Sequence, residues 1–154
     1  MIEISFLPDP AMDFIGAVDA DSVSDQMLLY GSFNYGLKFL VDGQEFLNGK
    51  GADPLLDFML YVADSLPRVR GGEAAVLEIF SSTHWIKITP TGTDAVITDS
   101  YGKDTARCTV TEYVTAATAF LTEALAYLSS RHPSLTDHPL LERVRSKIET
   151  TRLD

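Results

Sequence analysis

The chain has 154 residues, of which 45 % are hydrophobic and 22 % are charged, and it contains a single cysteine, Cys108. This length and balance are typical of one globular domain rather than a disordered or fibrous protein, and one cysteine excludes an intrachain disulfide, which fits a reducing cytoplasm. The formal net charge of −10 repels nucleic acids and acidic membranes, because phosphate binding needs clustered lysine and arginine.

The N-terminus and the apolar runs predict a soluble cytoplasmic protein. An acid, Glu3, stands where a secretory signal needs basic residues. The longest uncharged run, 26–37, is too short and too polar to span a bilayer, which takes about 20 apolar residues. We expect binding to neither a membrane nor a nucleic acid.

The first part of the chain alternates in the manner of β-strands. Ile2, Ile4 and Phe6 alternate with polar residues, which predicts a half-buried strand over 2–6. Asp42 and Gly43 form a hairpin signal, and 19–25 is a polar, turn-forming stretch that we expect to be an exposed loop. Further strands of this first meander are predicted over 14–18, 27–33, 36–41 and 45–47.

A helix and a second meander follow. Asp53 as the N-cap, Pro54 in the first turn and helically spaced apolar residues predict a helix over 54–66, with Pro67 as its end. Trp85 and Lys87 alternate with isoleucines, which indicates a strand with one buried face. The strands of this second meander are predicted over 75–80, 84–89, 95–99 and 105–108.

Residues 109–131 form the clearest helical pattern. Apolar residues recur there at steps of three and four, and Thr109 with Glu112 forms a capping box. A final helix is predicted after an Asp137 cap. If it packs on the threonine-lined outer face of the long helix, that helix is a scaffold only; if it does not, this face is a second candidate interface. The outer face carries Thr111, Thr115, Thr118, Thr122 and Ser129.

This order of elements predicts a single α+β domain over residues 1–154. Strands joined by short turns favour an antiparallel sheet, here of about six or seven strands in two meanders. We expect two helices to cover one face of the sheet, a short C-terminal helix to pack beside them, and the other face to be available for binding.

No motif for catalysis, a metal or a cofactor is present, and we expect none of the three. The stretch from Gly31 to Gly36 lacks the lysine that must directly follow the second glycine of a phosphate-binding loop. Val23 stands where a calcium loop after Asp19 and Asp21 needs Asp or Asn. The histidines lack ligand spacing, and Cys108 is interpreted as a small buried residue.

Acidic charge is concentrated in the first half. Residues 1–64 hold eleven acidic residues against two lysines, a net charge of −9. Aromatic residues are also dense in the first meander, and tyrosines beside carboxylates are typical of protein interfaces. We predict a surface for a basic protein partner formed by Asp19, Asp21, Asp25, Tyr30, Tyr35, Asp42 and Glu45.

Four stretches carry a resemblance to a known group of proteins: V-D-G-Q-E-F, D-P-L-L-D-F-M-L, H-W-I-K-I and V-T-E-Y-V. With the small size and the acidity, this arrangement resembles small acidic bacterial immunity proteins of polymorphic or contact-dependent toxin systems. The resemblance implies a non-catalytic protein, monomeric or homodimeric, that neutralises a cognate toxin by direct binding. An acidic surface would fit a basic toxin, such as a nuclease domain.

Two alternatives stay open. The chain could be a small enzyme or ligand-binding domain with a pocket between sheet and helices, for which His84, Trp85 and Tyr101 are the candidate residues. It could also be an accessory subunit that completes a larger complex.

Overall fold

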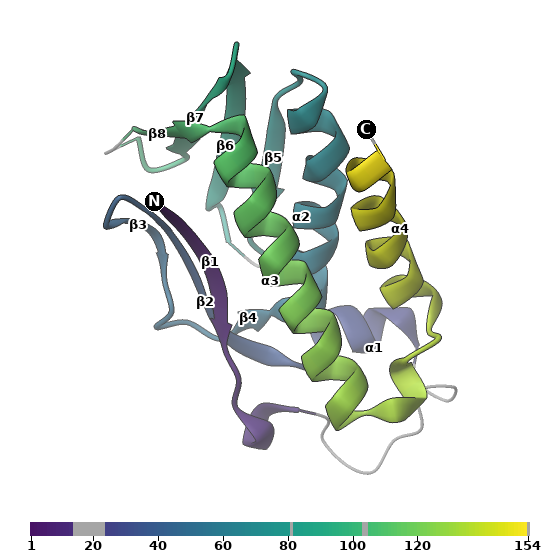
Figure 1. The fold of residues 1–154 in the computed structure, drawn as a ribbon. Helices are drawn as coiled ribbons and strands as arrows, with labels where there is room; N and C mark the ends of the chain where they lie inside the picture. The colour runs from purple at the N-terminus through teal and green to yellow at the C-terminus, as the bar shows by residue number, and fades with distance from the viewer. Residues whose placement is uncertain (14–23, 81, 103–104, 154) are drawn as a thin grey trace.

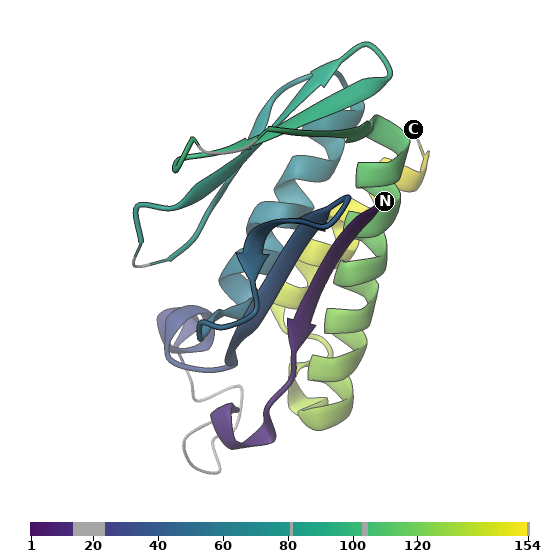
Figure 2. The same cartoon turned by 90° about the vertical axis from the view of Figure 1, so that its left-hand side faces the viewer.

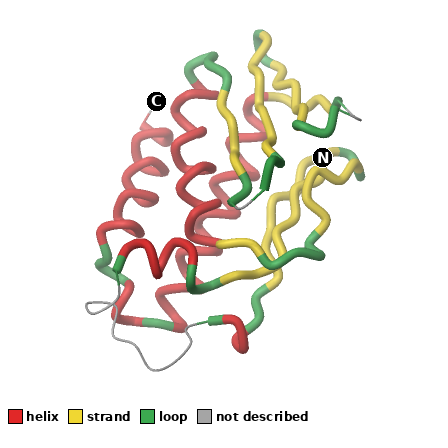
Figure 3. Tube along the Cα trace, turned by 180° about the vertical axis from the view of Figure 1, so that it is seen from behind, coloured by secondary structure: helices red, strands yellow, loops and turns green. Residues whose placement is uncertain are grey.

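The computed structural model of the chain describes residues 1–13, 24–80, 82–102 and 105–153. The described strands form two separate antiparallel sheets of four strands each, on the same side of the long helices (Figure 1 and Figure 2). From behind, the helices gather on one side of the molecule and the strands on the other (Figure 3). The α+β class is confirmed, whereas the single sheet of six or seven strands is wrong.

The first sheet is centred on β2 (Asn34–Val41). It pairs with β1 (Ile2–Leu7), β3 (Gln44–Asn48) and the short β4 (Asp53–Pro54). Asp42 and Gly43 have φ angles of 51° and 82°, which are the positive values that a tight two-residue hairpin requires. The hairpin prediction is therefore confirmed.

The second sheet has the strand order β5-β6-β7-β8. Its strands are β5 (Ala75–Glu78), β6 (Trp85–Thr91), β7 (Asp94–Asp99) and β8 (Ala106–Thr109). Ile86 and Ile88 are fully buried, whereas Trp85 is exposed and Lys87 half-buried. The predicted alternation along this strand is confirmed, and it gives the sheet one face toward the core.

Two long helices cover the core side of the sheets. They are α2 (Leu55–Arg70) and α3 (Val110–Arg131). The Thr109 hydroxyl accepts a hydrogen bond from the Glu112 N–H at 3.0 Å, and the Glu112 carboxylate accepts one from the Thr109 N–H at 3.3 Å, so the capping box is confirmed. The apolar stripe of α3 packs into the core, with Ala117, Leu121, Ala124 and Leu128 fully buried.

The C-terminal helix α4 (Pro139–Leu153) lies mainly along α2. Arg143 joins the two helices through an ion pair of 2.8 Å to Asp64. At its start, the Leu140 N–H donates to His138 Nδ1 at 3.1 Å, so His138 takes the capping role predicted for Asp137. Because α4 lies on α2, the outer face of α3 stays largely open, with Thr111, Thr115 and Thr122 exposed.

Two elements differ from those predicted, one in its type and one in its end. Residues 27–33 were expected to be a strand, but α1 (Asp25–Tyr30) is a helix with Ser24 as its N-cap. Six residues are too few to display a helical period, so the capping residue was the only local signal. Pro67 does not end α2 but lies inside it, and the helix continues to Arg70 with Val69 buried in the core. The predicted strand 14–18 and most of the predicted loop 19–25 lie outside the described residues.

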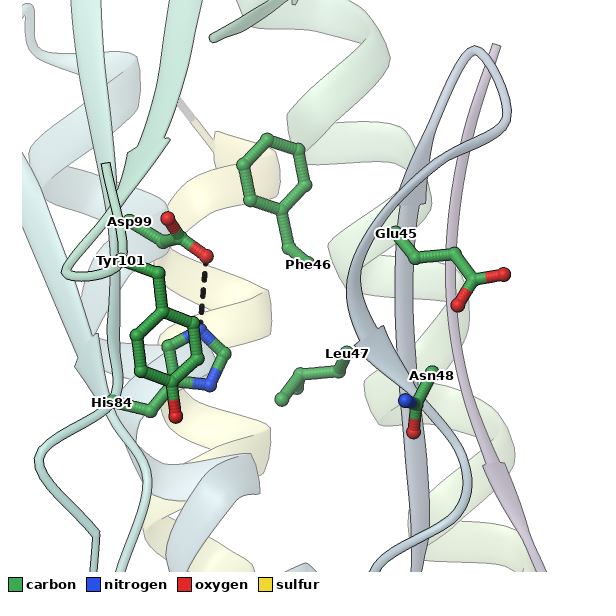
Figure 4. Close-up of a pocket in the computed structure, with 7 residues that line it drawn as sticks. All are labelled: Glu45, Phe46, Leu47, Asn48, His84, Asp99 and Tyr101. Atoms are coloured by element: carbon green, nitrogen blue, oxygen red, sulfur yellow. Dashed lines mark hydrogen bonds and ion pairs between the residues drawn. The ribbon is translucent and has the colours of Figure 1, made fainter. Parts of the chain in front are cut away.

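The helix α2 separates the two meanders in the sequence, and each meander forms a sheet of its own. Periodicity identifies a strand but not its partner when a helix intervenes. Among the described strands, each meander closes its own hydrogen-bond ladder, and no ladder pair joins the two. The buried Phe46 side chain of β3 lies between the sheets (Figure 4).

Candidate functional site

His84 lies where the two sheets face each other. Beside it is a hollow of about 350 Å³, which we call the intersheet hollow (Figure 4). One wall comes from β3 and the other from residues at the start of β6 and the end of β7. It is lined by Glu45, Phe46, Leu47, Asn48, His84, Asp99 and Tyr101.

A histidine–aspartate pair forms the polar wall of this hollow. His84 Nε2 lies 3.1 Å from Asp99 Oδ2, and each side chain is only 9 % exposed. The Tyr101 ring stacks on the imidazole with a centroid distance of 4.4 Å and an interplanar angle of 20°. Because a carboxylate accepts hydrogen bonds, it favours the tautomer that carries its proton on Nε2. Nδ1 is then an acceptor, and it points away from Asp99 (Figure 4).

This pair can act as a proton acceptor toward a bound molecule. No group of three His, Cys, Asp or Glu side chains there could hold a metal ion. Cys108 is buried, and burial raises the pKa of its thiol to about 11, so it is not an activated nucleophile.

A second hollow, of about 310 Å³, lies on the other side of His84, and we call it the aromatic hollow. Its walls come from the end of α1, the first two turns of α2, the end of β5 and the start of β6. Tyr30 stacks on Phe80 with a centroid distance of 4.2 Å. The hollow is lined by Tyr30, Asp57, Tyr61, Glu78, Phe80 and Trp85, together with Ile79, Ser82, Thr83 and His84.

Two carboxylates line the aromatic hollow. The Tyr61 hydroxyl donates to Glu78 Oε2 at 2.8 Å, and this bond raises the pKa of Tyr61 to about 12. Asp57 lies one turn before Tyr61 on α2, on the same face of the helix. Burial and then the neighbouring Glu78 raise the pKa of Asp57 from 3.8 to about 6, so this carboxylate ionises less readily than an exposed one.

The predicted partner-binding residues are dispersed. Glu45 lines the intersheet hollow and Tyr30 lines the aromatic hollow. Asp42 lies in the turn between β2 and β3, where it pairs with the N-terminal ammonium group. Asp25 begins α1, 3.7 Å from His138.

Tyr35 is not on the surface. Its side chain is 2 % exposed and its hydroxyl donates to Asp13, so it has no accessible group for a partner, and its assignment to a binding surface is corrected. Asp19 and Asp21 lie outside the described residues.

The three residues predicted for an enzyme or ligand-binding pocket, His84, Trp85 and Tyr101, lie close together. His84 and Tyr101 line the intersheet hollow, and Trp85 joins His84 in the aromatic hollow. The intersheet hollow lies between two sheets, whereas the aromatic hollow lies between strands and helices, as expected for the alternative pocket. Sequence reasoning missed Asp57, Tyr61 and Glu78, for which the four-residue step from Asp57 to Tyr61 was the only local signal.

Comparison of the chain with protein-family models, with curated proteins and with solved structures finds no match. No helix in the described part of the chain is both long enough and apolar enough to cross a membrane. The site must therefore be interpreted from its own chemistry.

Proposed function

We propose that the chain is a non-catalytic binding protein whose surface around His84 takes a basic segment of a partner protein. The observation that carries the proposal is the composition of the two hollows. Carboxylates and aromatic rings line them, and neither contains a lysine or an arginine among its described lining residues. Phe80, Trp85 and Tyr101 are 41 %, 36 % and 59 % exposed, and exposed aromatic rings are typical anchors of protein interfaces.

Charge supports this proposal. The acidic first half contributes Glu45 and Asp57 to the two hollows, and a negative field speeds association with a basic protein. The more specific proposal is an immunity protein that blocks a basic toxin, such as a nuclease domain, in the cytoplasm. Such a toxin binds nucleic acid through clustered lysine and arginine, which an acidic surface would cover.

The test uses the product of the reading frame directly upstream of this gene. Its C-terminal domain is expressed from an inducible promoter, with and without this chain, and growth is measured. We expect the chain to restore growth and Glu78→Lys to abolish protection, since the new charge repels a basic partner. Glu123→Lys is the matched control, because Glu123 is exposed on α3 and the net charge changes equally. An upstream product that is not toxic, or equal effects of both variants, would contradict the proposal.

The His84–Asp99 pair favours a second candidate function. An imidazole held by a carboxylate with Nδ1 free to accept a proton is a plausible general base for a small molecule in the intersheet hollow. His84→Gln tests the second function, because it removes the base and keeps every carboxylate. If the chain acts as a general base, the folded variant should lose turnover of a small molecule bound in the intersheet hollow. Turnover equal to that of the wild type would contradict this function.

A further inference from the structure

The aromatic hollow has the features of a site for one cationic side chain. Tyr30 and Phe80 stack in its wall, and Trp85 also lines it. The faces of aromatic rings carry negative potential and attract ammonium and guanidinium groups. A volume of about 310 Å³ lies at the small end of the range for ligand pockets, which suits a side chain better than a large molecule.

The carboxylates of this hollow have unused capacity to accept hydrogen bonds. Glu78 accepts one bond, from Tyr61, although a carboxylate has about four acceptor positions. Among the described residues, Asp57 makes neither a hydrogen bond nor an ion pair. Two carboxylates that lie close together without a cation repel each other, and a bound cation would relieve that repulsion.

Other acidic residues of the chain contrast with this pair. Asp64, further along α2, is paired with Arg143 at 2.8 Å, and Asp94 is paired with Arg107 at 3.3 Å. Asp57 and Glu78 have no such partner in the described part of the chain. A cation supplied by another molecule would complete this pair.

We propose that the aromatic hollow binds the guanidinium group of an arginine side chain inserted by the partner protein. This inference rests on the proposed function, since it names the contact by which a basic partner is recognised. Arginine fits better than lysine because its planar group stacks on aromatic rings and donates paired hydrogen bonds to carboxylates. Asp57 and Glu78 accept these bonds, while the plane of the group stacks on the outward face of an aromatic ring that lines the hollow.

The test is a titration that needs no partner protein. Trp85 is the only tryptophan of the chain, so its fluorescence reports binding in this hollow. The probe is N-acetyl-L-arginine methylamide, compared with the corresponding lysine and citrulline amides. Citrulline is the neutral match for arginine. We expect arginine to bind at least tenfold more tightly than citrulline and about threefold more tightly than lysine.

Two variants locate the binding. Glu78→Gln should weaken arginine binding about tenfold, whereas the matched Glu123→Gln should leave it unchanged. Phe80→Leu keeps an apolar side chain but removes the aromatic face, and should weaken arginine more than citrulline. Circular dichroism confirms that each variant is folded.

The outcomes separate this inference from the proposed function. Equal affinity for arginine and citrulline, tighter binding of lysine, or no effect of Glu78→Gln would overturn the inference, and growth protection would be unaffected by that result. Arginine binding without growth protection would instead overturn the proposed immunity function and leave the pocket in place.

Discussion

Replacing Asp13 with alanine is expected to lower the free energy of unfolding by about 3 kcal/mol. The Asp13 side chain is 5 % exposed and joins three parts of the fold. It accepts a hydrogen bond from the Tyr35 hydroxyl of β2, and Arg131 Nε of α3 lies 3.2 Å from its Oδ2. Tyr127 and His132 complete the cluster at 3.4 Å each.

Removing the carboxylate would leave the buried Tyr35 hydroxyl without its acceptor and Arg131 without its counter-charge. Burial and the bond to Asp13 raise the pKa of Tyr35 above its ordinary value, so this hydroxyl stays protonated and needs an acceptor. Urea unfolding monitored by circular dichroism measures the change. For a chain of this size, the loss corresponds to a fall in Tm of roughly 6–12 °C.

Two further variants calibrate this result. Asp13→Asn keeps an oxygen acceptor for Tyr35 but loses the charge opposite Arg131, so we expect about half of the loss. Glu123→Ala, on the exposed face of α3, should change stability by less than about 0.5 kcal/mol. A loss below about 1 kcal/mol for Asp13→Ala would mean that the cluster does not hold the Asp13 segment, β2 and α3 together.

Local chemistry made part of the fold predictable. The capping box of Thr109 and Glu112 and the Asp42-Gly43 turn each act within four residues, and both are as expected. Strand positions also followed from alternation, because a side chain's neighbours along a strand fix its face. These features depend only on residues close in sequence.

Long-range pairing was not predictable in the same way. Asp13 and Arg131 are 118 residues apart, and nothing near either residue in sequence signals the other. The division into two sheets likewise depends on which strands pair, and no local pattern shows this. Both the ion pair and the division into two sheets depend on how the whole chain packs, and a single sequence does not show this packing.

The candidate site also depends on long-range contacts that local sequence patterns do not predict. His84 and Asp99 are joined because the β6–β7 ladder sets Ile86 opposite Asp99, a register that cannot be derived from either residue alone. The aromatic hollow collects residues from two helices and two strands. Tyr30 and Glu45 were predicted as binding residues, but the carboxylates that complete the hollows come from segments that were assigned structural roles only.

Asp57→Asn is expected to stabilise the chain at pH 7 by about 1 kcal/mol, a value reduced because the side chain is only half-buried. Burial and Glu78 raise the pKa of Asp57 from 3.8 to about 6, so between these values the folded chain holds more protons than the unfolded chain. The free energy of unfolding therefore falls as the pH rises from about 4 to about 6. The asparagine variant lacks this loss. Urea unfolding should therefore show that Asp57→Asn is as stable as the wild type at pH 3.5 and more stable than the wild type at pH 7.

The same ionisation should control arginine binding. As Asp57 loses its proton between pH 5 and pH 7, affinity of the wild type for N-acetyl-L-arginine methylamide should rise about tenfold. Glu78, Tyr61 and His84 also face this hollow and stay in the asparagine variant. Any pH dependence that persists in Asp57→Asn therefore belongs to them.

A carboxylate that destabilises the fold yet strengthens binding is what a binding residue should be, since stability and function often oppose each other at functional sites. A purely structural Asp57 would behave in the opposite way, because its removal would weaken the fold and leave the probe's affinity unchanged. An asparagine variant less stable than the wild type at pH 7, or wild-type affinity that is constant from pH 5 to pH 7, would therefore assign Asp57 to the scaffold and leave Glu78 as the only carboxylate for an incoming arginine.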